Sequence, residues 1–405
     1  MSAPRIDPAT LNQRAWLEID HDAIAANVAI LTRLADGSRV APVVKADAYG
    51  HGIEAVTRTL AEAGVAAACI ATVDEAFLLR EAGIELPLLL LYPPPPDALD
   101  ELARLAVEPA VSTPAGVAAV AAWGRRRGPG APLLRVHLEL ETGLTRMGVL
   151  PAEAGPAAAA HAAAGGNVLA GLWCHIAVPG DPAGIARQVA ALSAAEASLR
   201  AAGVAVPVRH LAASGGLIAG GVPPLELIRP GIAVYGVLPD GLHAAPDRAA
   251  AAAALRPALS LRARPIRILE VPPGTPVSYG GRWVAQRTSR IATVPLGYGD
   301  GYSRTTGPGA EVLVHGRRAP IVGSIAMDAL MVDVTAIPEA GIDDEIVLLG
   351  DQGDERIGAG ELAERRGTIP WEVLATLSRR LPRIHRHPAG DGVRTLAGDR
   401  PAADV

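Results

Sequence analysis

The sequence predicts an α/β protein, with a (β/α)8 TIM-type barrel followed by a mainly β C-terminal domain. Short β-rich runs alternate with longer Ala- and Leu-rich stretches up to Leu238, which is typical of βα units around a parallel sheet. Beyond Leu238, turn signals become more frequent and the runs between them are β-forming. At 405 residues the chain is too long for one ordinary core, so we expect two domains.

Eight short runs are expected to form the barrel strands. They are Val40–Val44, Ala68–Thr72, Leu88–Leu91, Val107–Val111, Leu133–Leu138, Val168–Cys174, Val206–Leu211 and Ala233–Val237. Between them, apolar residues at helical spacing predict helices, including Asp22–Leu34, Pro114–Arg126 and Ala183–Ala202. An open doubly wound sheet is the alternative, but no Gly-x-Gly-x-x-Gly fingerprint follows an early strand.

After the barrel, a Pro-, Gly- and Ala-rich passage through Ala254 is typical of a linker. The β-forming runs beyond it are Leu259–Arg264, Arg290–Pro295, Glu311–Val314, Ala319–Val322 and Leu330–Val334. We therefore expect residues 1–250 to form the barrel domain, 251–387 the β domain and 388–405 a flexible tail. Pairing of the first N-terminal strand with the β domain is left open.

Composition argues against several classes of partner and location. Half of the residues are apolar, 20% are charged and the net charge is -5 without a basic block, which argues against nucleic acid or an anionic membrane as the main partner. Two cysteines cannot form a disulfide framework and fit a reducing compartment. The charged N-terminus is unlike a signal peptide, and apolar stretches are shorter than the ~20 residues that span a bilayer. We expect a cytoplasmic protein.

Residues 43–52 (VVKADAYGHG) are the most informative segment of the chain. An apolar strand run delivers Lys45 to its carboxyl end, where parallel-sheet enzymes keep their chemistry, and glycine-containing backbone follows. A lysine buried there can lose its proton and form a Schiff base with an aldehyde cofactor. The alternative is an ordinary lysine at the end of a strand.

This segment resembles the cofactor-lysine motif of the alanine racemases, which use pyridoxal 5'-phosphate (PLP), and the similarity extends over both domains. It implies that Lys45 bonds PLP and that Tyr49 lines the cofactor site. Residues 228–236 resemble the family's Arg-Pro-Gly segment, in which the arginine matched by Arg229 faces the pyridine nitrogen. A guanidinium cannot accept a proton, so it keeps this nitrogen neutral and restrains transamination. A salt bridge at a strand end is the alternative for Arg229.

Phosphate binding needs backbone donors at glycine-containing turns, and two such turns follow late barrel strands. The first begins at Ser214 and the second contains Gly231 and Ile232. Most Ser-Gly-Gly triplets are ordinary loops, but residues 210–213 resemble the family's lead-in to its phosphate-binding serine.

Racemisation requires proton-transfer groups on opposite faces of a planar carbanion, and Lys45 can serve one face. The resemblance implies that Tyr279 of the partner subunit serves the other, and that His175 links this tyrosine to Arg229. It also implies a homodimer with shared active sites. Arg146 and the partner's Met327 and Asp328 are the implied substrate-binding residues, and Tyr298 is implied to narrow the substrate entrance.

Several positions depart from the family pattern. Glu139 replaces a lysine that is often carbamylated, and we expect its carboxylate to pair with Arg146 without modification. Trp371 stands where a phosphate-binding tyrosine is customary, so its indole offers an N–H donor without a hydroxyl. Alanines replace polar residues at Ala213, Ala326 and Ala329. These departures concern substrate size and cofactor affinity more than the reaction class.

The favoured hypothesis is a PLP-dependent, metal-free racemase that interconverts L- and D-alanine. A racemase of serine or another small amino acid is the first alternative. A decarboxylase of basic amino acids, which shares this layout, would need an acidic pocket and usually a cysteine proton donor. A non-catalytic PLP carrier or inhibitor-binding protein of this barrel type would lack the second domain. The choice between D-alanine biosynthesis for peptidoglycan precursors and a specialised pathway stays open.

Overall fold

The computed structural model describes residues 7, 14–127, 133–163, 167–205, 208–307, 309–388, 390–395 and 398–401. The chain divides into two compact units. The barrel unit comprises residues 25–48 and 53–255, and the β unit comprises residues 1–24, 49–52 and 256–405. The division after the barrel thus falls at Leu255 rather than at residue 250, and the N-terminal strand belongs to the β unit.

Within the described residues, eight parallel strands form the barrel. They are β2 (Arg39–Val40), β3 (Ala68–Ile70), β4 (Leu88–Leu90), β5 (Val107–Val111), β6 (Leu134–Glu139), β7 (Asn167–Trp173), β8 (Val208–Ala213) and β9 (Leu227–Arg229). From β3 to β9 each strand pairs with the next, and β9 pairs with β2. A parallel bridge between Val43 and Cys69 closes the ring. The predicted barrel is confirmed, and its parallel strands all end at one rim.

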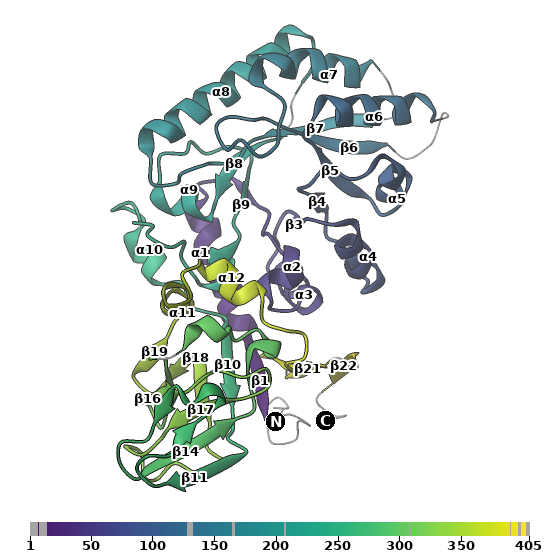
Figure 1. Ribbon diagram of the computed structural model, residues 1–405. Helices are drawn as coiled ribbons and strands as arrows, with labels where there is room; N and C mark the ends of the chain where they lie inside the picture. Colours follow the sequence, from purple (N-terminus) through teal and green to yellow (C-terminus); the bar gives the residue numbers. More distant parts are fainter. Residues whose placement is uncertain are drawn as a thin grey trace. The chain divides into compact units, whose positions relative to one another are not determined.

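Helices alternate with these strands. They are α1 (His21–Leu34), α2 (Lys45–Tyr49), α3 (Ile53–Glu62), α4 (Val73–Glu81), α5 (Leu99–Arg104), α6 (Pro114–Arg125), α7 (Ala154–Ala162), α8 (Pro182–Ala201) and α9 (Ser214–Ala219), with the short 3-10 helices η2 (Pro96–Ala98) and η3 (Pro151–Glu153). The N-cap Thr113 accepts the Gly116 amide at 3.0 Å, and Pro114 opens α6. Helices α6, α7 and α8 lie side by side outside the strands (Figure 1). The three named helices were each predicted to within one residue.

The eighth strand differs from the prediction. Residues 232–235 form the 3-10 helix η4 (Ile232–Tyr235), and the strand is β9, which ends before Pro230 and Gly231. All four η4 residues are buried, and a short buried apolar run does not by itself distinguish a strand from a helix. The prediction of a strand at Ala233–Val237 is therefore wrong. For the predicted strand Val206–Leu211, residues 206 and 207 lie outside the described residues.

The passage expected to be a linker contains α10 (Ala249–Ala253). Alanine has the highest intrinsic helix propensity, because its side chain loses no rotamer freedom in a helix. The alanine run therefore forms a short helix where composition alone indicated a linker.

The β unit is built on a large, mainly antiparallel sheet, as expected. Its strands follow the order β11 (Arg267–Val271), β14 (Ser289–Val294), β17 (Leu330–Asp333), β16 (Arg317–Val322), β15 (Glu311–Val314), β18 (Ile346–Gln352), β10 (Leu259–Ala263), β1 (Ala15–Asp20), β20 (Arg383–Arg386), β21 (Gly392–Thr395) and β22 (Gly398–Pro401), and β19 (Glu355–Ile357) pairs with β18. The remaining elements are the hairpin β12 (Pro276–Val277) and β13 (Trp283–Val284), α11 (Ala359–Arg366), α12 (Pro370–Ala375), η5 (Tyr279–Gly281), η6 (Tyr298–Asp300) and η7 (Arg304–Thr306). Strand β1 pairs antiparallel with β10 and parallel with β20.

Part of the expected flexible tail is ordered. Strand β21 pairs with β20, and β22 pairs with β21. Val393 of β21 is 2% exposed and packs in a cluster with Trp16 and Ile384. An apolar side chain that covers core residues stabilises the strand that carries it, which explains the difference. The rest of the expected tail at 389, 396–397 and 402–405 lies outside the described residues.

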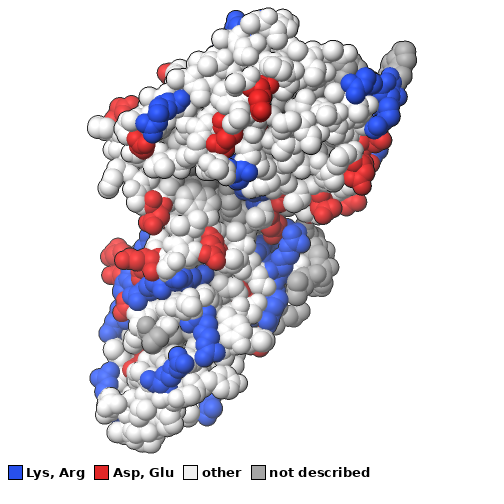
Figure 2. Space-filling model, turned by 45° about the horizontal axis from the view of Figure 1, so that its top comes forward, with Lys and Arg blue, Asp and Glu red and all other residues white. Residues whose placement is uncertain are grey.

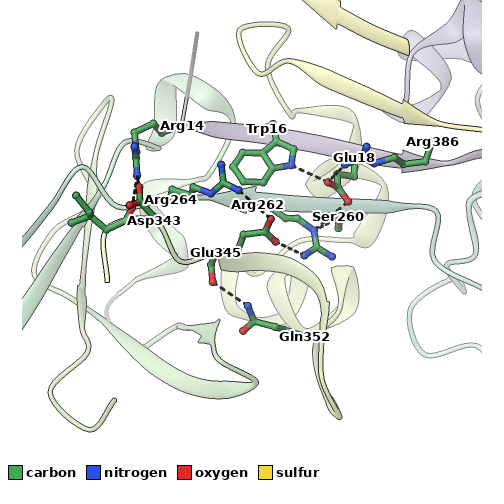
Figure 3. Close-up of polar contacts among 11 residues, drawn as sticks. Arg14, Trp16, Glu18, Ser260, Arg262, Arg264, Asp343, Glu345, Gln352 and Arg386 are labelled. Carbon is green, nitrogen blue, oxygen red and sulfur yellow. Dashed lines mark hydrogen bonds and ion pairs between the residues drawn. The ribbon is translucent and has the colours of Figure 1, made fainter. Parts of the chain in front are cut away.

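A row of charged side chains crosses the central strands of the β unit (Figure 3). Glu18 of β1 lies between Arg386 of β20, at 2.7 Å, and Arg262 of β10, at 3.5 Å. Arg262 also contacts Glu345, next to β18, at 2.9 Å. The indole of Trp16 donates to Glu18 at 3.2 Å. Alternating charges thus link four neighbouring strands, and each charge has a partner of opposite sign.

On the face shown in Figure 2, basic and acidic side chains lie in small groups among uncharged ones. Non-specific nucleic-acid binding uses a continuous basic surface. The described residues of this face do not form one. In the part of the chain that the structure describes, no helix has the length and apolar character to cross a bilayer.

Candidate active site

Lys45 begins a left-handed turn at the rim of the barrel. Ala46, Asp47 and Ala48 have φ values of 54°, 56° and 54°, and Tyr49 has a φ of 52°. The left-handed conformation costs an L-residue roughly 1–2 kcal/mol, and it is rare for several non-glycine residues in succession. Such strain persists only where surrounding contacts hold it, and it is concentrated at functional sites.

Glu75 of α4 is one of the groups that hold this turn. Its Oε1 accepts the Ala46 amide at 2.7 Å, and its Oε2 accepts the amides of Ala71 at 2.7 Å and Thr72 at 3.2 Å. The same carboxylate forms the capping box of α4 with Thr72. Asp47 also contributes, because its carboxylate accepts the amide of Ile53 at 2.9 Å. Glu75 is not among the predicted site residues, although the spacing of Thr72 and Glu75 is a capping-box signal.

The environment of Lys45 favours its neutral form. Burial and then the positive charge of Arg146 lower the pKa of Lys45, and Glu75 partly opposes them. The ring of Tyr92 lies near both cations, with its centroid 5.6 Å from Lys45 Nζ and 5.7 Å from Arg146 Cζ. Tyr92 follows β4, and no motif in the sequence indicated it. A lowered pKa makes the neutral amine of Lys45 more available as a nucleophile or base than that of an ordinary lysine.

Glu139 lies at the end of β6 and is 2% exposed. Its Oε1 is 3.6 Å from an Arg146 guanidinium nitrogen, and its Oε2 accepts the Ser112 hydroxyl at 2.5 Å. Burial raises the pKa of Glu139, although Ser112 and Arg146 partly offset that effect. The contact orients Arg146, whose side chain is 37% exposed, so its remaining donors can bind a carboxylate.

Arg229 ends β9 and is fully buried beside Trp173, with its Cζ 4.5 Å from the ring centroid. It donates one hydrogen bond to Nδ1 of His210 and another to the carbonyl of Cys174 at 3.0 Å. These two bonds are the hydrogen bonds of Arg229 among the described residues, and its link to His175 stays a prediction. His175 lies near three positively charged side chains, those of Arg229, Arg146 and Lys45. Burial and then these three charges lower the pKa of His175 to about 3.

The two predicted phosphate turns are in contact with each other. Ser214 at the start of α9 is buried, and its Oγ accepts the amides of Gly231 at 2.9 Å and Ala233 at 3.2 Å. These bonds occupy both lone pairs of the hydroxyl, so its single O–H remains to donate, and the described residues offer it no acceptor. The N-cap residues of α9 and of η4, which Ile232 opens, supply no side-chain cap, although Ser214 itself accepts the Ala233 amide of η4. A phosphate oxygen would accept the remaining Ser214 hydroxyl proton.

The predicted site residues of the β unit lie at its surface. Tyr279 opens η5 with 74% of its surface exposed, while its backbone carbonyl accepts the Ser324 hydroxyl at 3.1 Å. The turn that carries Tyr298 approaches the Met327 segment, because the Tyr298 amide donates to the Ala326 carbonyl at 3.1 Å. An added Cβ on Gly297 would lie 2.2 Å from the Ala326 carbonyl, so this approach requires glycine.

Asp328 pairs with Arg380 at 2.7 Å, and its side chain is 61% exposed. Trp371 is half-buried at the second position of α12. The same helix approaches Gly50, whose added Cβ would lie 2.3 Å from the Leu374 carbonyl. This close contact places α12 beside the loop that follows Tyr49 within the β unit.

The two halves of the chain match two family models. The alanine racemase N-terminal domain matches residues 19–239, and the alanine racemase C-terminal domain matches residues 258–385. The chain belongs to the alanine racemase family. The alanine racemase of Sorangium cellulosum (strain So ce56) is 36% identical over 388 residues, which covers 93% of this chain and 99% of that protein.

Solved alanine racemases share the fold. The alanine racemase of Clostridium difficile 630 has a TM-score of 0.87 at 28% identity, covering 95% of this chain and 99% of that chain. That of Bacillus anthracis with bound L-Ala-P has a TM-score of 0.84 at 30% identity, covering 97% and 99%.

Alanine racemases are PLP-dependent isomerases, and the barrel unit fits this cofactor. Lys45 offers an amine whose pKa is lowered, for the cofactor aldehyde. Ser214 offers a buried hydroxyl hydrogen without an acceptor among the described residues, for the phosphate. Arg229 offers a guanidinium held by His210 and Cys174, for the ring nitrogen. These three groups thus suit the aldehyde, the phosphate and the ring nitrogen of PLP.

Proposed function

We propose that this chain interconverts L- and D-alanine with bound PLP, by a two-base mechanism in a homodimer with shared active sites. The observation that carries the proposal is the left-handed turn that presents Lys45, with its lowered pKa, at the barrel rim. The match to the alanine racemase family over both domains supports the same reaction.

The barrel residues bind the cofactor and substrate. Lys45 would hold the PLP aldehyde, Ser214 with the turn at Gly231 and Ile232 would hold the phosphate, and Arg229 would face the ring nitrogen. Tyr49 and Trp371 would complete the cofactor contacts. When bound, PLP draws electron density from the substrate Cα and makes its proton removable.

Two side chains move the proton. Lys45 Nζ takes it from one face of Cα, and the hydroxyl of the partner subunit's Tyr279 supplies it on the opposite face, or the reverse. His175 lies beside this site as a neutral imidazole, because its pKa is about 3. Arg146, oriented by Glu139, binds the substrate carboxylate together with Met327 and Asp328 of the partner subunit, and Tyr298 narrows the entrance.

Surface exposure supports the homodimer. Tyr279, Met327 and Tyr298 are 74%, 53% and 41% exposed in the single chain. Large side chains that project into water from a site-forming surface are typical of residues that a second subunit covers. The free cysteines Cys69 and Cys174 are both buried and fit a reducing, cytoplasmic location.

The cysteines also argue against the decarboxylase alternative. Burial raises the pKa of Cys69 to about 12 and that of Cys174 to about 11. The chain has no other cysteine, so no accessible thiol is available as a proton donor.

The test is incubation of the PLP-loaded protein with L-alanine, L-serine and a panel of other L-amino acids in deuterated water, followed by chiral analysis. We expect D-alanine with deuterium at Cα. Inversion of serine rather than alanine would transfer the assignment to another small amino acid. Absence of both exchange and inversion would contradict the proposal.

Replacing Tyr279 with Phe removes the hydroxyl and keeps the ring. Loss of one proton-transfer group costs about 10²–10⁴-fold in rate, so we expect at least a hundredfold slower racemisation in both directions. Deuterium exchange without inversion should persist through Lys45. A Tyr279→Phe variant that racemises alanine at the wild-type rate in both directions would refute the two-base assignment.

A further inference from the structure

Four side chains form a continuous row across the barrel interior, beginning at Arg229. Arg229 donates to Nδ1 of His210, and Nε2 of His210 lies 2.8 Å from Nδ1 of His137. Nε2 of His137 lies 2.7 Å from Oε2 of Glu108. The row runs through β9, β8, β6 and β5, so it joins the site arginine to a carboxylate on a distant strand.

Hydrogen-bond directions along the row follow from its first member. A guanidinium can only donate, so Nδ1 of His210 accepts and its proton is on Nε2. That N–H donates to Nδ1 of His137, whose own proton is then on Nε2 and is donated to Glu108. Burial lowers the pKa of both histidines, and each is neutral at physiological pH. One arrangement of protons therefore satisfies all three bonds.

The barrel is shaped to allow this row. Strand β7 lies between β6 and β8, and His137 pairs in register with Gly171 of β7. A Cβ at Gly171 would lie 2.3 Å from Nδ1 of His137. Only glycine lets the imidazole cross over β7 to reach His210. The His210 ring also stacks on Trp173, with an interplanar angle of 4°.

We propose that Glu108 and His137 are positioning residues for Arg229, and that they act by holding His210 in the tautomer that accepts from the guanidinium. This inference rests on the proposed function, in which Arg229 faces the PLP ring nitrogen. Without the carboxylate, His210 is free to carry its proton on Nδ1. Two donors would then face each other, and Arg229 would turn away.

A displaced Arg229 has a specific chemical consequence. The ring nitrogen would gain access to a proton and the cofactor would become a stronger electron sink. Transfer of the substrate amino group to PLP, with water releasing the substrate as its keto acid, would then compete with racemisation. The number of racemisation turnovers per cofactor converted therefore reports the position of Arg229. A merely structural role of Glu108 would change activity and stability without changing this ratio.

The first measurement does not depend on the activity of any variant, because variants are used only to assign signals. The holoenzyme is labelled with ¹⁵N-histidine, and the ring signals of His137 and His210 are assigned from His137→Asn and His210→Asn. We expect both rings to be neutral with the proton on Nε2 between about pH 6 and 8. A proton on Nδ1 of His210 would overturn the proposal whatever the activity.

The second measurement compares Glu108→Leu, Glu108→Gln and His161→Asn with the wild type. Leu removes the acceptor, and loss of one such bond should lower the turnover ratio about tenfold with little change in KM. Gln keeps an acceptor oxygen and should stay within about twofold of the wild type. His161 is another buried histidine of the barrel unit, outside the row, and its variant controls for loss of a buried imidazole.

The outcomes separate the two proposals. A wild type that inverts no amino acid refutes the proposed function. The tautomers of His137 and His210 alone then decide whether the row holds the predicted arrangement of protons. A wild type that racemises alanine while Glu108→Leu keeps the wild-type ratio overturns the positioning role and leaves the proposed function intact.

Discussion

At the residue scale, the carboxylate of Glu75 joins two backbone segments of the barrel that are distant in sequence. It accepts the Ala46 amide beside Lys45 and the Ala71 and Thr72 amides before α4. Carboxylate bonds to backbone N–H groups are charge-assisted and stronger than neutral ones. One side chain therefore stabilises both the start of a helix and the strained turn that presents Lys45, the proposed cofactor lysine.

Replacing Glu75 with Ala leaves these three amides without their acceptor. We expect the turn at Lys45 to lose its position and PLP affinity to fall at least tenfold, in line with the loss of about 1.5–3 kcal/mol per charged hydrogen bond. The pKa of Lys45 should fall further, because Glu75 raises it. Spectroscopic titration with PLP measures both effects.

Asp74→Asn is the matched control, since Asp74 is an exposed carboxylate in the same turn of α4. If Glu75→Ala and Asp74→Asn bind PLP equally well, Glu75 does not hold the turn.

At the element scale, β21 extends the sheet of the β unit beyond β20 and covers its edge. Val393 is the side chain through which this strand joins the core, since it packs with Trp16 and Ile384. The backbone pairs of β21 lie at the margin of the sheet, and the apolar contact adds to them.

Truncating Val393 to Ala removes two buried methyl groups, which should lower the free energy of unfolding by about 2 kcal/mol. Val284→Ala is the control, because this valine is 38% exposed in the same unit and its truncation should cost less than about 0.5 kcal/mol. Urea unfolding measures both. Equal midpoints for the two variants would show that β21 adds nothing to the stability of the sheet.

At the scale of the whole molecule, buried histidines make the fold sensitive to acid. Burial is the largest cause that lowers the pKa of each of the following five side chains. The pKa of His21 falls to about 2, that of His175 to about 3 and that of His161 to about 4, and those of His137 and His210 also fall. All five therefore titrate at a lower pH in the folded chain than unfolded histidines, which titrate near ~6.5.

Below about pH 6.5 the unfolded chain therefore binds more protons than the folded chain, and stability falls as the pH falls. Each such histidine costs about 1.4 kcal/mol per pH unit, for His161 until about pH 4 and for His21 until about pH 2. Glu139 and Asp300 act in the opposite direction, because burial raises their pKa values. The histidines outnumber them.

We expect the urea midpoint to fall steeply between about pH 6.5 and 5, and His161→Asn to reduce that slope by the contribution of one proton. A midpoint that stays constant over this range would contradict the assignment of these histidines as neutral in the folded chain.

The sequence by itself determined the fold class and most of the site chemistry. The alternation of short β-rich runs with helical stretches is a local property, so seven of the eight barrel strands and three named helices could be placed from it. The Lys45 turn, the proposed phosphate-binding Ser214 and the pairing of Glu139 with Arg146 lie in local motifs, which can be recognised without knowledge of the fold.

Only the tertiary structure decided which distant residues meet. Strand register and barrel closure decide the eighth strand, the contact of Arg229 with His210, the bonds of Glu75 and the row that ends at Glu108. Packing within the β unit decides the order of β21. These contacts join residues from separate strands, and no local pattern encodes the distance between them. A shifted pKa can also be recognised only once burial is known, because desolvation changes the chemistry of a side chain and leaves no mark in the sequence.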